Sequence, residues 1–371
     1  MTPRRRMLLA IDRGPLDEVP IVICYLGIFL RDHWQGITDK PWWALRSPDI
    51  ADRLEVDRDL LGKLDLDWIP CSMCQPESWR RSHSIRVENG RVLLVGEDGT
   101  RDEIRKPPPG GDTLYIAPEP VIEDVSEIED AIPVRDAAEL RRQGRLDYVK
   151  MLRRDIGSDR FLVASMVTPF WKALSQSFGF RSMMLNLRRD PRLVERALER
   201  ITEDRGEMIR AYARAGVDGI WLEECLASAA EISPADYRRF VLPYNRELVE
   251  VIHDEGIRCI YYPCGDVTDR MESIIETGTD CISLEESKKG FRIEISEVDR
   301  AVSGRACLFG NLSSDLLERG SDRELTAGIG HQIEVGRRNG RFVMSLGSPV
   351  TPGTGVQRVA EYVRISREES R

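Results

Sequence analysis

From residue 216 onward, one unit recurs along the chain: a glycine that ends a helical pattern, a short apolar run, and then polar or glycine-rich residues. Glycine suits the left-handed conformation that follows a helix, and apolar runs without alternation are typical of strands buried on both faces. The glycines are Gly216, Gly256, Gly278, Gly304 and Gly340. The runs are 220–222, 259–262, 281–284, 306–309 and 342–346. This recurring pattern of glycines and apolar runs predicts parallel strands that alternate with helices.

Three earlier apolar runs bring the expected strands to eight: 19–25, 66–71 and 161–166. Eight parallel strands, each followed by a helix, close into a (β/α)8 or TIM barrel, a fold of the α/β class. The alternative is a division into two domains of ordinary size. We expect a single barrel domain across residues 1–371.

Residues 76–118 interrupt this rhythm. Apolar and polar residues alternate from Ser84 to Val95, a turn signal follows at 97–100, and a proline–glycine tract occupies 107–111. Alternation with a period of two and turn residues between the runs are typical of antiparallel strands. We expect an inserted β excursion near residues 76–118.

Several helix boundaries carry their own signals. Asp190-Pro191 is typical of a helix start, and so is Ser233-Pro234, whose helix should kink at Pro243. Ser321 followed by Glu324 predicts a capping box for a further helix.

Charge and hydropathy narrow the class of protein. The formal net charge is −9, and no basic stripe offsets it, so nucleic acid is not an expected partner. No segment approaches the roughly 20 apolar residues of a membrane span, and the apolar stretch after Arg4–Arg6 is too short for a signal peptide. We expect a cytoplasmic protein whose 8 cysteines are reduced.

Side chains able to bind metal or move protons follow three of the expected strands. They are Glu223-Glu224-Cys225, then Tyr262 and Cys264, then Glu285-Glu286. The carboxyl ends of barrel strands share one face, so these groups should converge there. Thiolates suit zinc, which in catalytic sites takes three protein ligands and keeps a fourth position open. The alternative for Cys225 and Cys264 is that both are small buried hydrophobic residues.

Adjacent carboxylates on a strand point to opposite faces, so one of each pair can face a pocket while the other forms a salt bridge with one of the many arginines. Any of Glu223, Glu224, Glu285 and Glu286 could supply an oxygen ligand to the metal. Of these groups, we assign metal ligation to Glu223 with the two cysteines, and acid or base roles to Glu224, Glu285 and Tyr262. The spacing Cys71-Ser-Met-Cys74 is a weak metal signal because no second pair accompanies it.

Aromatic residues gather at the expected strand ends, and an excess on one face suits a flat, partly apolar substrate. Tyr25, Phe170 and Trp171 are candidates for substrate binding. His33, after the first expected strand, could also reach the pocket. No nucleophilic triad can be assembled, and no glycine-rich phosphate loop is present.

Several segments resemble the uroporphyrinogen decarboxylase superfamily. They are Ala215-Gly-Val-Asp-Gly-Ile-Trp, Ile232-Ser-Pro-Ala-Asp-Tyr-Arg-Arg-Phe-Val-Leu-Pro-Tyr, Pro263-Cys-Gly-Asp, Gly278-Thr-Asp-Cys-Ile-Ser, Phe309-Gly-Asn-Leu and Ser345-Leu-Gly-Ser-Pro. The resemblance spans the chain in layout and is strongest from about residue 160. It implies a distorted TIM barrel with its site at the carboxyl face of the strands. The superfamily contains heme-pathway decarboxylases and corrinoid-dependent methyltransferases.

The decarboxylases carry an Arg-Gln-Ala-Gly-Arg signature after the first strand, where this chain reads Cys24-Tyr-Leu-Gly-Ile-Phe-Leu-Arg31. They also carry a histidine in the last glycine loop, where this chain has Gly347-Ser348-Pro349. These departures argue against decarboxylation of uroporphyrinogen itself.

The methyltransferases bind zinc through a His-x-Cys and a later cysteine in the last glycine loop. Cys264 matches the first cysteine, whereas Tyr262 replaces the histidine and Ser348 the later cysteine. If zinc is kept, the resemblance implies that Cys225 and a glutamate, Glu223 or Glu224, replace the lost ligands. The departure favours a variant that activates a different methyl donor.

The sequence hypothesis is a zinc-dependent methyltransferase that demethylates a small substrate, such as a methoxylated aromatic. Zinc would act as a Lewis acid on the leaving heteroatom. The methyl group would pass to the cobalt of a corrinoid on a separate carrier protein, and a glutamate or Tyr262 would protonate the leaving oxygen. Asn311 and Ser348, in the matching segments, are assigned to substrate binding.

Two other hypotheses stay open. A metal-free decarboxylase or lyase acting on a small acid would need a cation in the pocket, with Arg31 as the candidate. A non-catalytic binding protein on the same barrel would tolerate loss of the usual ligands. A homodimer is compatible with a barrel, but no residue pattern indicates one.

Overall fold

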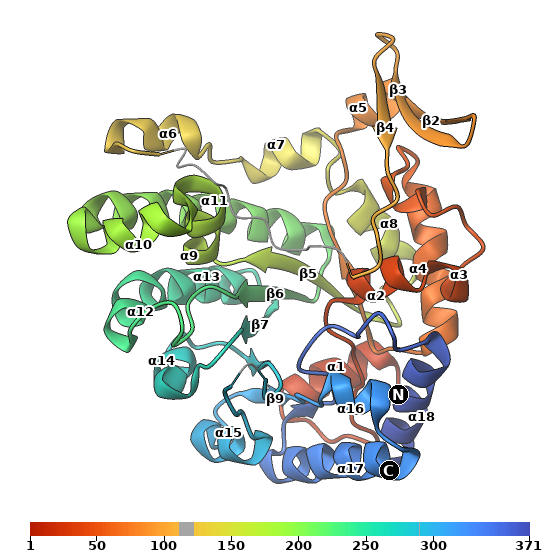
Figure 1. The fold of residues 1–371 in the computed structure, drawn as a ribbon, viewed down its shortest axis with the longest axis vertical. Helices are drawn as coiled ribbons and strands as arrows, with labels where there is room; N and C mark the ends of the chain where they lie inside the picture. Colours follow the sequence, from red (N-terminus) through yellow and green to blue (C-terminus); the bar gives the residue numbers. More distant parts are fainter. Residues whose placement is uncertain (111–121, 289) are drawn as a thin grey trace.

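The computed structural model describes residues 1–110, 122–288 and 290–371 (Figure 1). Its central sheet is curled and parallel, with the strand order β1-β5-β6-β7-β8-β9-β10. The strands are β1 Trp68–Cys71, β5 Phe161–Val167, β6 Gly219–Glu224, β7 Arg258–Pro263, β8 Cys281–Ile282, β9 Cys307–Phe309 and β10 Phe342–Val343. With helices between successive strands, this arrangement confirms the predicted (β/α)8 barrel class.

The expected strand at 19–25 is not a regular strand in the structure, yet it closes the barrel. On one side, Ile21 bridges Met344, and the Val22 amide donates to the Met344 carbonyl at 2.9 Å. On the other side, the Asp67 amide donates to the Ile21 carbonyl at 2.9 Å, and the Asp67 carboxylate accepts from the Ile21 amide at 2.7 Å. The Asp67 side chain therefore replaces a backbone carbonyl as the acceptor of one strand-pairing hydrogen bond. Pro20 has no backbone N–H and cannot donate to a neighbouring strand. The prediction of a full strand there is wrong for these reasons.

Helices lie outside the curled sheet and connect its strands (Figure 1). Those up to β5 are α1 Pro3–Ile11, α2 Leu26–Asp32, α3 Trp34–Ile37, η1 Ala44–Arg46, α4 Ile50–Leu64, α5 Glu77–Ser82, η2 Val125–Glu127, α6 Ile128–Ala131, α7 Ala137–Arg142 and α8 Asp147–Asp155. Those after β5 are α9 Pro169–Lys172, η3 Ala173–Phe178, α10 Gly179–Arg189, α11 Pro191–Ala215, α12 Pro234–Phe240, α13 Leu242–Asp254, η4 Thr268–Arg270, α14 Met271–Ile275, α15 Ile295–Val302, α16 Ser314–Arg319, α17 Asp322–Asn339 and α18 Val356–Ser370.

The helix signals in the sequence are confirmed. Asp190 caps α11 through the Leu193 amide, and Ser321 with Glu324 forms the capping box of α17. The kink expected at Pro243 is a break between α12 and α13, with Pro243 in the first turn of α13. All five glycines of the repeated unit have positive φ, between 70° and 99°.

The inserted β region is a three-stranded antiparallel sheet that projects from the barrel (Figure 1). Its strands are β2 His83–Glu88, β3 Arg91–Gly96 and β4 Arg101–Ile104. Asn89 and Gly90, with φ of 50° and 78°, form the tight turn between β2 and β3. The expected excursion is confirmed for this sheet, and its last part, residues 111–118, lies outside the described residues.

Aromatic rings from separate strands pack inside the barrel. The ring centroids of Trp68 on β1 and Trp221 on β6 are 5.3 Å apart, and Phe309 on β9 lies 5.9 Å from Trp68. Within the part of the chain that the structure describes, no helix is both long and apolar enough to cross a membrane.

Candidate active site

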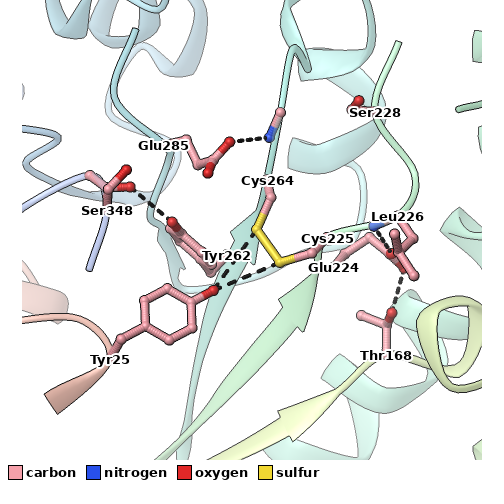
Figure 2. The surroundings of a disulfide bond; sticks show 12 residues. Tyr25, Thr168, Glu224, Cys225, Leu226, Ser228, Tyr262, Cys264, Glu285 and Ser348 are labelled. Carbon is pink, nitrogen blue, oxygen red and sulfur yellow. Dashed lines mark hydrogen bonds between the residues drawn. A yellow bond between two sulfur atoms is a disulfide. The ribbon is translucent and has the colours of Figure 1, made fainter. Parts of the chain in front are cut away.

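The two cysteines singled out by the sequence meet at the carboxyl end of the barrel. β6 and β7 are adjacent parallel strands, and Cys225 and Cys264 each follow directly after one of them. Their Cα atoms are 4.5 Å apart, and the two sulfurs form a disulfide (Figure 2). The other six cysteines are free. The expectation of reduced thiols throughout is therefore wrong for this pair, because neighbouring strand ends hold the side chains within disulfide reach.

Tyr25 lies over the disulfide (Figure 2). Its hydroxyl oxygen is 3.7 Å from the Cys225 sulfur and 4.0 Å from the Cys264 sulfur. Tyr25 adopts a left-handed conformation with φ of 53°, immediately before α2. A non-glycine residue in this region carries a backbone cost, and such costs concentrate at functional sites.

A cavity of about 520 Å³, here called the aromatic cavity, adjoins Tyr25. Its walls come from the 23–30 segment, α4, β1, β5 and β6. Rings of Tyr25, Trp68 and Trp221 line it, together with the polar side chains Arg53, Asp57, Ser72, Ser165 and Glu223. A largely apolar cavity with few polar groups is the usual form of a small-molecule site.

The adjacent glutamates at the end of β6 have separate environments. Glu223 lines the aromatic cavity, and burial raises the pKa of its carboxyl. Glu224 is 1% exposed, accepts a hydrogen bond from the Thr168 hydroxyl, and accepts another from the Leu226 amide at 3.1 Å (Figure 2). Burial raises the pKa of Glu224 to about 7. Of the two, Glu223 is the carboxyl placed to meet a ligand in the cavity.

Tyr262 is fully buried behind Tyr25, and its ring stacks on Trp221 at a centroid distance of 4.9 Å. Its hydroxyl donates to the Gly347 carbonyl at 2.9 Å. Burial raises the pKa of this phenol well above its ordinary value. The Tyr262 hydroxyl, to which the sequence analysis gave an acid role, therefore donates its hydrogen to a backbone carbonyl in the last glycine loop.

Glu285 and Ser348 both contact the ammonium group of Lys288. The Lys288 ammonium lies 2.6 Å from the Glu285 carboxylate and donates to the Ser348 hydroxyl at 2.8 Å. Glu285 also accepts from the Gly265 amide at 2.8 Å, beside Cys264 (Figure 2). These contacts tie the loop after β8 to the loop after β7.

Asn311 makes hydrogen bonds through both ends of its side-chain amide. It donates to the Glu285 carbonyl at 3.2 Å and to the Ile293 carbonyl at 3.1 Å, and it accepts from Gln332 at 3.1 Å. With an exposed fraction of 5%, its side-chain amide joins the loop after β8 to its neighbours.

The other residues assigned to substrate binding lie away from the aromatic cavity. His33 and Arg31 line a second cavity of about 800 Å³, where Arg31 pairs with Asp32 at 2.7 Å. Phe170 is buried in the core, and half-buried Trp171 packs against that core. Neither lines the aromatic cavity.

Arg53, Asp57 and Trp68 line the aromatic cavity without having been identified in the sequence. Trp68 lies in a strand that the sequence did predict, so its strand position was an available signal. Arg53 and Asp57 lie on α4, which precedes β1. Nothing in a helical pattern indicates which polar residues border a cavity.

The disulfide between Cys225 and Cys264 involves two of the three predicted zinc ligands. Among the residues that the structure describes, no three His, Cys, Asp or Glu side chains are grouped to hold a metal ion. The Cys225 and Cys264 sulfurs are bonded to each other in the disulfide and are not available as thiolate ligands. Reduction would release two adjacent thiolates, and Glu223 lies two residues before Cys225, near the end of β6. Two thiolates and a carboxylate are donors of the kind that zinc binds.

The family model for uroporphyrinogen decarboxylase (URO-D) matches residues 109–369, which is more than half of the chain. The chain belongs to the uroporphyrinogen decarboxylase family. This confirms the resemblance seen in the sequence.

Named relatives of this family member are enzymes of two kinds. Uroporphyrinogen decarboxylase of Chlorobium phaeovibrioides is 28% identical over 201 residues, covering 53% of this chain and 54% of that protein. The chain thus spans about half the length of the first curated relatives it matches. The methylcobamide:CoM methyltransferase MtbA of Methanosarcina acetivorans is 23% identical over 226 residues, covering 59% of this chain and 62% of that protein.

A solved methyltransferase from Methanosarcina mazei shares the fold of this uroporphyrinogen decarboxylase family member. The two align with a TM-score of 0.67 and 21% identity over 99% of each chain. Methyltransferases therefore stand among both its relatives and its structural neighbours.

Proposed function

We propose that this chain is a methyltransferase that moves a methyl group from a methoxylated aromatic compound to the cobalt of a corrinoid on a carrier protein. The observation that carries the proposal is the contact of Cys225 and Cys264 with the hydroxyl of Tyr25, a residue that lines the aromatic cavity. In the proposed complex, the Tyr25 hydroxyl and the two sulfurs beside it would meet the methyl–oxygen bond of a bound aryl ether. The similarity to a methylcobamide:CoM methyltransferase supports methyl transfer as the reaction class.

In the reduced protein, Cys225, Cys264 and Glu223 would hold zinc. Bound zinc would supply Lewis acidity at the ether oxygen. The Tyr25 hydroxyl lies next to both sulfurs and lines the cavity, so it can donate a hydrogen bond to the oxygen that loses the methyl group. The rings of Trp68 and Trp221 would hold the aromatic plane and exclude water.

The overall exchange balances without a further reactant. The methyl–oxygen bond breaks, the methyl group passes as a cation equivalent to the reduced cobalt, and the remaining phenolate takes a proton from solvent. Tyr262 is less suited to that proton step than the sequence hypothesis held, because its hydroxyl is buried and donates to the Gly347 carbonyl. Glu224 is likewise occupied by Thr168 and Leu226.

The decarboxylase alternative rested on Arg31 as the pocket cation. Arg31 pairs with Asp32 and lines the second cavity, so it does not face the aromatic cavity. Arg31 is therefore not placed to serve as the pocket cation of that alternative.

The test is to purify the protein under reducing, chelator-free conditions, measure its zinc, and incubate it with methoxylated aromatics and chemically reduced cobalamin. We expect about one zinc per chain, as in catalytic sites with three protein ligands, and formation of both methylcobalamin and the matching phenol. A Cys225→Ser/Cys264→Ser variant should lose the zinc and both products.

Cys74→Ser serves as the matched control, because Cys74 is a free, partly buried cysteine whose thiol contacts backbone carbonyls at 144 and 145. It should keep zinc and activity. A metal-free wild type, or zinc retained by the double variant, would refute the zinc assignment. Phenol formation by a metal-free wild type would leave methyl transfer standing without zinc.

A further inference from the structure

The aromatic cavity has a cationic side that the proposed reaction does not use. Arg53, in the first turn of α4, lines the cavity together with Ser72, which follows β1. Its guanidinium donates to the Ser72 hydroxyl at 3.0 Å and stacks over the Tyr148 ring at 3.9 Å from the centroid. These contacts hold the guanidinium in place while leaving donor groups for a ligand, since arginine carries five N–H donors.

Among the residues that the structure describes, no Asp or Glu oxygen lies within ion-pair distance of Arg53. The nearby Asp57 is 6% exposed and accepts a hydrogen bond from the Tyr148 hydroxyl. Burial raises the pKa of the Asp57 carboxyl to about 7, which weakens it as a fixed counter-charge. A cation beside an apolar cavity that forms no ion pair with a described residue is suited to an anionic ligand.

The sheet order sets the distance between the two ends of the cavity. Glu223 lies at the end of β6, Ser72 follows β1 and binds Arg53 of α4 by a hydrogen bond, and β5 runs between β1 and β6. Two strand spacings correspond to about 10 Å. A single aromatic ring with substituents at opposite positions spans such a gap, and the rings of Trp68 and Trp221 line the cavity between its ends.

We propose that the methyl donor is an aromatic carboxylic acid whose carboxylate is bound by Arg53 while its methoxy group faces Tyr25 and the cysteine pair. This assignment rests on the proposed function for the fate of the methyl group, but the binding claim stands on the cavity alone. Arg53 is then a specificity-determining residue that selects aromatic acids over neutral aryl ethers.

The experiment compares 4-methoxybenzoate with its neutral isostere 4-methoxybenzamide by isothermal titration calorimetry. The wild type should bind the acid at least about tenfold more tightly, because hydrogen bonds to charged groups contribute more than neutral ones. Arg53→Gln should abolish this preference, and Arg53→Lys should keep part of it, since lysine retains the charge without the planar fork.

Arg58→Gln is the matched control on the same helix: Arg58 is exposed, pairs with Asp155, and does not line the cavity. It should bind like the wild type. Equal binding of acid and amide by the wild type, no binding of either, or an unchanged preference in Arg53→Gln would overturn the assignment.

Product analysis separates this assignment from the proposed function. Methyl transfer should yield 4-hydroxybenzoate with its carboxylate intact. A wild type that prefers the acid but forms no such product would refute the methyltransferase and leave Arg53 as the acid-binding residue. Conversely, methyl transfer from neutral ethers without any preference for acids would keep the proposed function and overturn the role of Arg53.

Discussion

Asp57 is a buried carboxyl whose ionisation the fold opposes. It lies on α4 beside the aromatic cavity, and burial raises its pKa to about 7 from the value of 3.8 expected in an unfolded chain. Between these two values the folded state binds the extra proton. Its contribution is therefore most favourable below pH 3.8 and declines as the pH rises to about 7.

Asp57→Asn removes this ionisation while keeping an acceptor for the Tyr148 hydroxyl. On moving from pH 5 to pH 8, the wild type should lose about 1–3 kcal/mol of unfolding free energy relative to the variant, because one pKa unit corresponds to about 1.4 kcal/mol. Urea denaturation of both proteins at the two pH values measures this difference. Parallel pH dependences would show that Asp57 titrates normally in the folded protein.

At the scale of elements, the Asp67 side chain helps to close the barrel where the segment around Ile21 pairs incompletely with the segment before β1. Asp67, fully buried before β1, accepts from the Ile21 amide and pairs with Arg6 of α1 and with Arg367 of α18, the latter at 2.7 Å. Asp67→Ala would leave two arginines and one amide without this partner. We expect a loss of about 3–5 kcal/mol, as for other broken buried ion pairs, measured by chemical denaturation.

Asp159→Ala tests whether the loss is specific to the closure. Asp159 is an acid with a half-exposed side chain that pairs with its neighbour Arg160. Its replacement should change the unfolding free energy by less than about 0.5 kcal/mol. Similar losses in both variants would contradict a special role for Asp67 in joining the two ends of the sheet.

At the scale of the whole molecule, the proposed zinc and the disulfide would compete for the same sulfurs. A ligand that binds only the folded state stabilises it, by about 2.7 kcal/mol at a concentration 100-fold above its dissociation constant. Zinc should therefore raise the melting temperature of the reduced protein by several degrees and leave that of the oxidised protein unchanged. Differential scanning calorimetry with and without a chelator measures both states.

The Cys225→Ser/Cys264→Ser variant should show no response to zinc in either redox state. An equal rise in the oxidised wild type or in this variant would place the zinc elsewhere on the chain.

The sequence alone determined the order and kind of the elements. Glycines with positive φ, helix caps and uninterrupted apolar runs act over a few residues, so their meaning survives without knowledge of the fold. The convergence of Cys225 and Cys264 was also predictable, since the carboxyl ends of parallel strands must share one face. The last strands were expected to be longer than the two or three residues of β8, β9 and β10.

Only the tertiary structure decided which side chains border the cavity. Whether Glu223 or Glu224 faces a ligand depends on how β6 twists against its neighbours, and Arg53 reaches the cavity only because α4 packs beside the end of β1. His33 lies between α2 and α3, and Phe170 and Trp171 lie on α9; none of the three lines the aromatic cavity. Such positions are set by packing between residues far apart in the chain, which no local pattern encodes.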